Sequence, residues 1–258
     1  MDALTREQVL DELDHLAAVT HAQLVEFLFI ACAMGNESQA PQGASSAAVQ
    51  IADAVGEARS ASIGQMRQLL RINEVLVLAG REPNLGRATE LRGGPSPGIA
   101  LAALTAAQLD GLFDRQLTIA QAIDRRYAAL RPSVDPDGSP VFDEDLAGRI
   151  SLVIDIGVEH ATVVTRVRDA LAGLSPSMYF TVTRDAAHAD SDVERSLLDL
   201  SDRWYDFIVV TLQLGFGNEQ LRNAMLNRAG TAMFSMDAVD SLLAARKLLP
   251  AFTPSSGL

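Results

Sequence analysis

The sequence predicts an all-α protein: a four-helix bundle with one long crossover, followed by two additional C-terminal helices. Three observations support this fold class. Long segments repeat apolar residues at spacings of three and four, which is the periodicity of a helix buried on one side. Alanine and leucine dominate and aromatic residues make up only 5% of the 258 residues. No run of alternating apolar residues indicates a strand.

Two long helices are expected in the first 80 residues. The first begins at Thr5, where a hydroxyl followed by acidic and amide side chains is typical of a helix start, and ends at Gly35-Asn36. The second covers about 47–80, after a polar loop at 37–46. Residues 81–98 are rich in proline and glycine, so they are expected to form an extended crossover.

The third helix is expected from Thr105 to Leu130, before a turn-rich loop at 132–140. The fourth spans about 143–174 as one continuous helix, and its inward face includes His160. Residues 5–174 would then form the core bundle of four helices.

Two further helices are expected within residues 192–250, at about 193–214 and 219–249, after a break at 175–192. Residues 253–258 resemble a frayed tail. Because no linker separates two parts of the chain, residues 1–258 are expected to form a single domain.

Composition excludes several functional classes. The 33 acidic and 21 basic side chains give a net charge of -12, and no basic cluster is available to bind nucleic acid. Cys32 is the only cysteine, so neither an intrachain disulfide nor a cysteine-based zinc site is expected. The first residues show no cationic-then-apolar signal, which favours a cytoplasmic protein. Apolar windows such as 207–214 fall short of the ~20 residues of a membrane span, so no membrane association is expected.

Helix bundles bind cofactors and substrates between their helices, so polar residues on inward faces are candidates for a functional site. Five such residues are Thr20 on the first helix, Gln65 and Gln68 on the second, Gln121 on the third and His160 on the fourth. Gln65 and Gln68 are three residues apart, which places both amides on one helix face.

The segment at 79–87, Ala-Gly-Arg-Glu-Pro-Asn-Leu-Gly-Arg, is the most specific motif of the chain, and 24–29 and 65–73 accompany it. These segments resemble a bacterial ferritin-like family of natural-product biosynthesis, which includes the ferritin-like part of the iminophenylpyruvate dimer synthases of the violacein, rebeccamycin and staurosporine pathways. Looser matches at 118–121, 160–164 and 248–250 extend the resemblance over most of the chain. The resemblance implies a ferritin-like bundle.

Ferritin-like proteins usually bind two metal ions through a Glu on each of two helices and a Glu-x-x-His on each of the other two. At the matching positions this chain has Thr20, Gln65, Gln68 and Gln121, and Gly157 stands three residues before His160. Neutral amides and hydroxyls are poor substitutes for carboxylates on iron. We therefore expect no metal cofactor, although a single ion held by His160 with Asp155 or Glu159 stays open.

The leading hypothesis is a metal-independent enzyme that cyclises, condenses or rearranges a small organic substrate. His160 would be the acid–base group, oriented by Glu159 or Asp155, because imidazole exchanges protons near neutral pH. Thr20, Gln65, Gln68 and Gln121 would hold the substrate. The opposing interpretation is that the former metal site has collapsed into a satisfied polar core without a ligand.

Two further hypotheses stay open. A non-catalytic bundle would stabilise a partner biosynthetic protein through an exposed apolar face, for which the last helix is a candidate through Leu242, Leu243, Leu248 and Leu249. A mononuclear metal-dependent oxidase or oxygenase would use His160. Amphipathic helices also make a homodimer or other homo-oligomer plausible.

Overall fold

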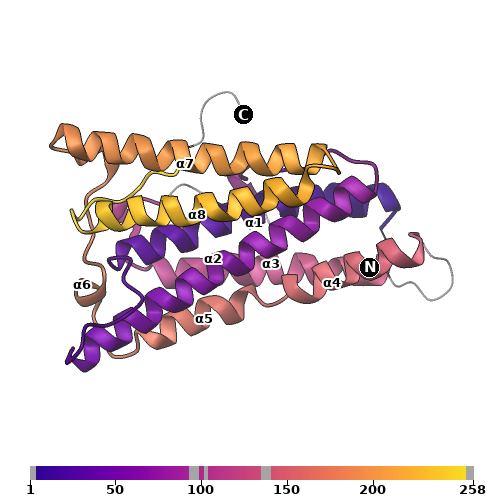
Figure 1. Ribbon diagram of the computed structural model, residues 1–258. Coiled ribbons are helices and arrows are strands. Elements are labelled where there is room, and N and C mark those ends of the chain that lie inside the picture. Colours follow the sequence, from indigo (N-terminus) through magenta and orange to yellow (C-terminus); the bar gives the residue numbers. More distant parts are fainter. Residues whose placement is uncertain (1–3, 93–98, 102–103, 135–140, 254–258) are drawn as a thin grey trace. The chain divides into compact units, whose positions relative to one another are not determined.

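The computed structural model describes residues 4–92, 99–101, 104–134 and 141–253 and is mostly helical, which confirms the all-α prediction (Figure 1). The chain divides into two compact units. The first comprises 1–24, 63–103 and 113–165, and the second comprises 25–62, 104–112 and 166–258.

Helices α1 (Arg6–Ala33) and α2 (Ser46–Leu78) contribute residues to both units. Contrary to the sequence expectation, α1 is long and apolar enough to cross a membrane by length and composition alone. However, 89% of its most apolar 18-residue window is buried, and a buried core helix has the same composition.

Both helices end at the glycines that the sequence indicated. Gly35 has φ 97° and Gly80 has φ 83°, a left-handed conformation that glycine adopts without a steric penalty. Asn36 N donates to Ala31 O and Gly35 N to Cys32 O, and the end of α2 repeats this pair of bonds. These are Schellman caps, which satisfy carbonyls left free at a helix end.

The start of the crossover is held to the first unit by two buried or half-buried asparagines. Asn73 Nδ2 donates to Leu69 O and to Asn84 O, and Asn84 N donates to Asn73 Oδ1 at 2.5 Å. Asn84 Nδ2 donates to Asp14 O on α1 at 3.0 Å. The Pro-Asn-Leu-Gly segment therefore has a structural role, because its asparagine joins the crossover to α1 and α2.

Two short strands follow, β1 (Glu90–Leu91) and β2 (Ile99–Ala100), which pair antiparallel and were not expected. The intervening residues 93–98 lie outside the described part of the chain, as do 135–140 of the expected turn-rich loop and 254–258 of the expected tail.

The third helix, α3 (Leu112–Val134), begins seven residues later than expected. Thr105 N does bond to Gln108 Oε1, but this arrangement caps only the 3-10 turn η1 (Ala106–Gln108). The chain then turns at Gly111, where φ is 63°, before the helix starts. Thr105 therefore precedes a 3-10 turn and, contrary to the sequence prediction, is not the start of the long helix.

The expected single helix at 143–174 is also wrong, because the structure has two helices, α4 (Glu144–Gly157) and α5 (His160–Ala170). Asp143 caps α4 by accepting a hydrogen bond from Leu146 N at 2.9 Å. The break places His160 at the first turn of a new helix.

The core of the first unit is one apolar cluster from four helices. Leu13, Leu16, Ile72, Leu76, Ile123 and Ile150 are each at most 1% exposed within it. These residues recur at the spacings that predicted the helices, so helical periodicity and burial agree.

The second unit contains the short helix α6 (Pro176–Tyr179), the 3-10 turn η2 (Ala186–His188), and the long helices α7 (Asp192–Gly217) and α8 (Arg222–Ala244). Helices α7 and α8 lie side by side (Figure 1). Trp204 of α7 packs against Val239, Leu243 and Leu248, which are buried.

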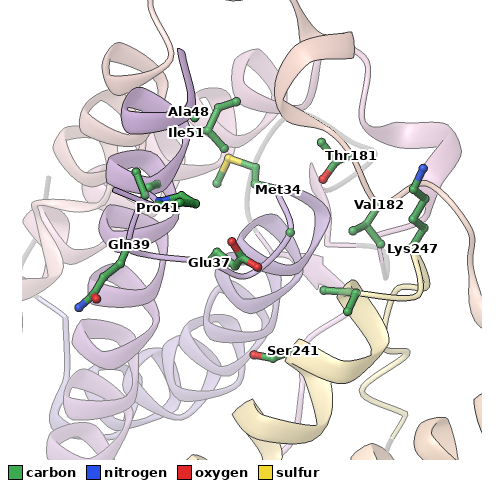
Figure 2. A pocket seen from close by; sticks show the side chains of 15 residues that line it. Met34, Glu37, Gln39, Pro41, Ala48, Ile51, Thr181, Val182, Ser241 and Lys247 are labelled. Atoms are coloured by element: carbon green, nitrogen blue, oxygen red, sulfur yellow. The ribbon is translucent and has the colours of Figure 1, made fainter. Parts of the chain in front are cut away.

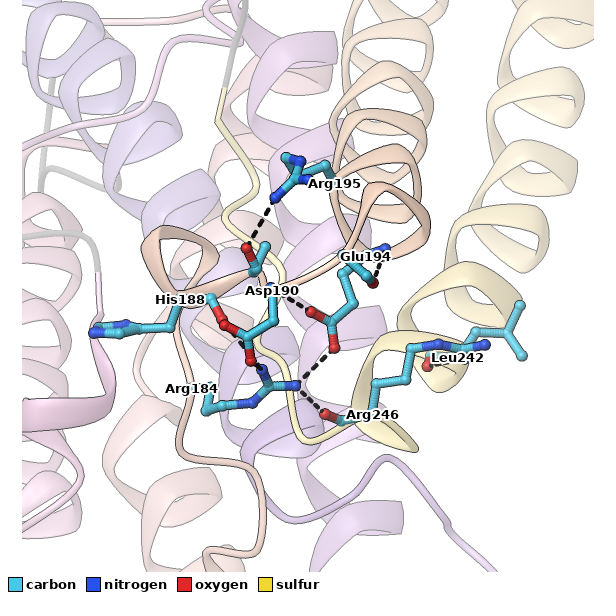
Figure 3. Close-up of polar contacts among 9 residues, drawn as sticks. Arg184, His188, Asp190, Glu194, Arg195, Leu242 and Arg246 are labelled. Atoms are coloured by element: carbon cyan, nitrogen blue, oxygen red, sulfur yellow. Dashed lines mark hydrogen bonds and ion pairs between the residues drawn. The ribbon is translucent and has the colours of Figure 1, made fainter.

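Arg184, in the segment before α7, forms hydrogen bonds with the start of α7 and with the residues that follow α8 (Figure 3). Its guanidinium donates to Asp190 Oδ2 at 2.8 Å, to Glu194 Oε1 at 2.8 Å and to the Arg246 carbonyl at 2.6 Å. Glu194 also accepts from Asp190 N at 2.7 Å. The Arg184 hydrogen bond holds the pKa of the Glu194 carboxyl below its usual value.

Candidate functional site

A group of polar side chains lies in the interior of the first unit, and we call it the buried polar cluster. It comprises Thr20 from α1, Gln65 and Gln68 from α2, Asp124 and Tyr127 from α3, and His160 from α5. Apart from Asp124, whose side chain is 19% exposed, each member is at most 6% exposed. Four of the five inward polar residues chosen from the sequence are therefore in one buried region.

Asp124 explains why the helix breaks before His160. Its Oδ1 accepts from His160 N at 2.9 Å, and its Oδ2 accepts from Ala161 N at 3.0 Å. The first amides of a helix have no partner within it, and an anion is favourable at this end. Asp124 thus caps α5 from another helix, and the same carboxylate contacts the His160 ring.

The His160 ring has hydrogen-bond acceptors on both sides. Nδ1 lies 2.7 Å from the Gly157 carbonyl and 3.2 Å from Asp124 Oδ1, so it carries a proton. Nε2 lies 3.2 Å from Gln65 Oε1. That contact is favourable when the ring is an imidazolium, or when the Gln65 amide is turned so that its NH₂ donates to a neutral ring. In both cases Nε2 is the ring nitrogen that faces Gln65.

Tyr127 covers one face of this imidazole. The two rings are nearly parallel, with an interplanar angle of 9° and centroids 5.7 Å apart. The phenol oxygen lies 3.2 Å from Thr20 Oγ1. Burial raises the pKa of Tyr127 to about 12, and contacts with Thr20 and Gln68 partly oppose that rise, so the phenol stays neutral.

Gly157 is required by this packing. A Cβ built at Gly157 would lie 2.4–2.6 Å from three ring atoms of Tyr127, much closer than van der Waals contact. The tyrosine ring therefore fills the space that a side chain at 157 would occupy. A carboxylate at this position is incompatible with the observed ring.

Gln68 is only partly satisfied. Its Nε2 donates to the Val153 carbonyl at 2.8 Å, whereas its Oε1 has no hydrogen-bond partner among the described residues. An unpartnered buried acceptor costs free energy, so this oxygen is the point in the cluster where an added donor would be most favourable.

Three predicted residues lie elsewhere. Gln121 is exposed on α3, and the carbonyl of its own backbone accepts from Arg125. Asp155 is exposed and forms an ion pair with Arg131. Glu159 is also exposed, in the break between α4 and α5. The carboxylate that contacts the His160 ring is therefore that of Asp124, and not that of Asp155 or Glu159 as expected.

Sequence reasoning missed Asp124 and Tyr127. A signal was present, because these two residues are three apart on α3, and Tyr127 continues the apolar stripe of Ile119 and Ile123. The sequence analysis placed Gln121 on the inward face of this helix, whereas the apolar stripe that Tyr127 continues lies on a different face.

The donor set does not suit a pair of metal ions. It offers two amides, two hydroxyls, one imidazole and one carboxylate, and that carboxylate caps α5. Within residues 4–92, 99–101, 104–134 and 141–253, no group of three or more His, Cys, Asp or Glu side chains is placed to hold a metal ion. A di-metal centre needs several anionic oxygens to balance its charge.

The two histidines of α1, His15 and His21, lie outside the cluster. Burial lowers the pKa of His15 and of His21 to about 4. His15 Nε2 accepts from Arg92 N at 3.1 Å, and His21 Nδ1 lies 2.9 Å from the Leu85 carbonyl. Both rings join α1 to the crossover and are neutral at pH 7.

No protein-family model, curated protein or solved structure matches the chain.

Proposed function

We propose that the chain is a ferritin-like bundle that has exchanged its metal site for an acid–base centre acting on a small organic substrate. The observation that supports this is the Asp124–His160–Gln65 arrangement, in which a carboxylate orients an imidazole whose other nitrogen faces inward. The proposed reaction is a metal-independent cyclisation, condensation or rearrangement, since these need proton transfer and no redox metal.

The roles follow from the contacts. His160 is the proposed catalytic group, through Nε2, because Gly157 and Asp124 occupy Nδ1. Asp124 is a positioning residue that stabilises the imidazolium formed during proton transfer. Its partly exposed carboxylate also connects the ring with solvent. Gln65 and the unpartnered Oε1 of Gln68 would bind polar groups of the substrate.

The test is conversion of compounds in a small-molecule extract of the source cells, followed by mass spectrometry. We expect wild-type protein to consume at least one compound, and His160→Gln to lose that activity by about 100-fold or more. His188→Gln is the matched control, because this histidine is exposed in the second unit. Circular dichroism would verify that each variant folds.

Either of two results would contradict the proposal. One is consumption of the same compound by His160→Gln at the wild-type rate. The other is near-stoichiometric iron or manganese in protein purified without chelator, which would favour the mononuclear metal alternative.

A second candidate function, a non-catalytic partner subunit, is favoured by exposed apolar side chains on α7 and α8. Phe234 is 80% exposed and Leu214 is 56% exposed. Of the four leucines expected on this face, only Leu242 is exposed, whereas Leu243, Leu248 and Leu249 are buried. Exposed apolar side chains mark an interaction surface where they form one contiguous patch. If this face binds a partner protein, Phe234→Ser should abolish co-purification of that partner with the chain.

A further inference from the structure

The second unit contains a cavity of about 370 Å³ that is separate from the buried polar cluster (Figure 2). It is lined by the end of α1, the loop that follows, the start of α2, residues 181–182 and the end of α8. Met34, Ala52 and Val182 are buried and give it an apolar floor. The volume is in the range of small-molecule sites.

Two opposite charges lie on the lining of this cavity. Glu37 follows α1 and Lys247 follows α8, and Figure 2 shows them on different segments around the cavity. In the described part of the chain, neither side chain forms an ion pair or a hydrogen bond with another residue. Ser241 and Thr181 add hydroxyl groups. An apolar floor with separate positive and negative groups suits a ligand that carries both charges.

Lys247 is unusual in two ways. It is the only lysine in the chain, where the other basic side chains are all arginine. It also has φ 58°, in the left-handed region that side chains other than glycine, asparagine and aspartate rarely adopt.

The backbone at Lys247 does not by itself call for a lysine. Leu248 N donates to Leu243 O and Lys247 N donates to Ala244 O, which is the Schellman pattern. At the equivalent position, α1 has Gly35 and α2 has Gly80. Both Gly35 and Lys247 line the cavity, so the α8 cap places a cation there where the α1 cap has only a glycine. A strained backbone at a non-glycine residue motivates a functional hypothesis for its side chain.

We propose that this cavity binds a small zwitterion with an apolar body, which is the chemistry of an apolar α-amino acid. Lys247 binds the carboxylate, Glu37 binds the ammonium group, and Met34 and Val182 contact the apolar side chain. The site is independent of the acid–base proposal, because its residues belong to the second unit and those of the cluster to the first.

Calorimetry with three probes tests the proposal: L-leucine, 4-methylpentanoate, which lacks the ammonium group, and 3-methylbutylamine, which lacks the carboxylate. We expect leucine to bind, and each singly charged probe to bind with a Kd at least about fivefold higher, since each loses one exposed ion pair. Absence of leucine binding at millimolar concentration would overturn the proposal.

Two variants assign the charges. Lys247→Gly keeps the helix cap and should raise the Kd of leucine and 4-methylpentanoate about fivefold, but leave that of the amine unchanged. Glu37→Gln should raise the Kd of leucine and of 3-methylbutylamine about fivefold and leave that of 4-methylpentanoate unchanged. Arg246→Gln is the matched control, because this neighbouring cation does not line the cavity. Leucine binding that neither Lys247→Gly nor Glu37→Gln weakens would also overturn the assignment.

Discussion

Gly157→Ala tests the packing of the buried polar cluster with one methyl group. The added Cβ would lie 2.4–2.6 Å from ring atoms of Tyr127. The ring cannot easily move away, because it is 0% exposed, stacked on His160 and within hydrogen-bonding distance of Thr20. Either the ring or the α4 backbone has to shift, and both changes also displace the His160 contacts.

Two opposing effects set the magnitude. Overpacking a buried site costs about 1–3 kcal/mol, and the rigid surroundings favour the upper part of that range. Replacing glycine by alanine in a helix gains up to about 1 kcal/mol. The expected net loss in the free energy of unfolding is therefore about 1–2 kcal/mol.

Urea unfolding followed by circular dichroism measures this loss. Gly148→Ala is the matched control, since this glycine is exposed on the same helix and a Cβ there has no atom within 4 Å. We expect the control to gain about 0.5–1 kcal/mol. Adding Tyr127→Leu to Gly157→Ala should remove the steric conflict and reveal coupling in a double-mutant cycle. If Gly157→Ala is as stable as Gly148→Ala, the close approach to Tyr127 is refuted.

Three further predictions concern stability. Burial raises the pKa of Asp240 to about 7, so the folded state binds more protons than the unfolded state between about pH 4 and 7. The free energy of unfolding should therefore fall by up to about 4 kcal/mol as pH rises through this range. Urea titrations at pH 5 and 8 should show a smaller difference in that free energy for Asp240→Asn than for the wild type. The pKa of the buried His21 is lowered to about 4, so the stability of the folded state is complete above about pH 6.5 and falls by up to about 3 kcal/mol on acidification. An acid-unfolding midpoint that does not move in His21→Gln would contradict this prediction. Asn84→Ala leaves Asn73 Oδ1 with its bond to the backbone but removes the bonds to Asp14 and Gly86, and a thermal melt should show a loss of about 1–3 kcal/mol.

The helices were predictable wherever their determinants are local. Apolar periodicity located α1, α2 and α7, and glycine marked the ends of α1 and α2 because a left-handed cap needs only that residue. The break between α4 and α5 was not predictable in this way. It depends on Asp124, which is 36 residues before His160 in sequence and reaches the start of α5 only in the folded chain.

The candidate site shows the same division. Thr20, Gln65, Gln68 and His160 were found because each interrupts an apolar stripe. The prediction that Gln121 faces inward was wrong, because it lies two residues from both Ile119 and Ile123, roughly 200° around the helix from each. Tyr127 was overlooked because an aromatic residue on such a stripe is usually core, and here it is both core and cluster member.

Trp204 gives the second unit its own optical reporter. It is the only tryptophan, it packs on Val239, Leu243 and Leu248, and its ring meets Phe207 edge-on at 5.9 Å. Its fluorescence therefore follows the loosening of α7 from α8, whereas far-ultraviolet circular dichroism follows the helices of both units. Transitions that coincide by the two signals would mean that the chain unfolds as one cooperative body, and separate transitions would give each unit its own melting temperature.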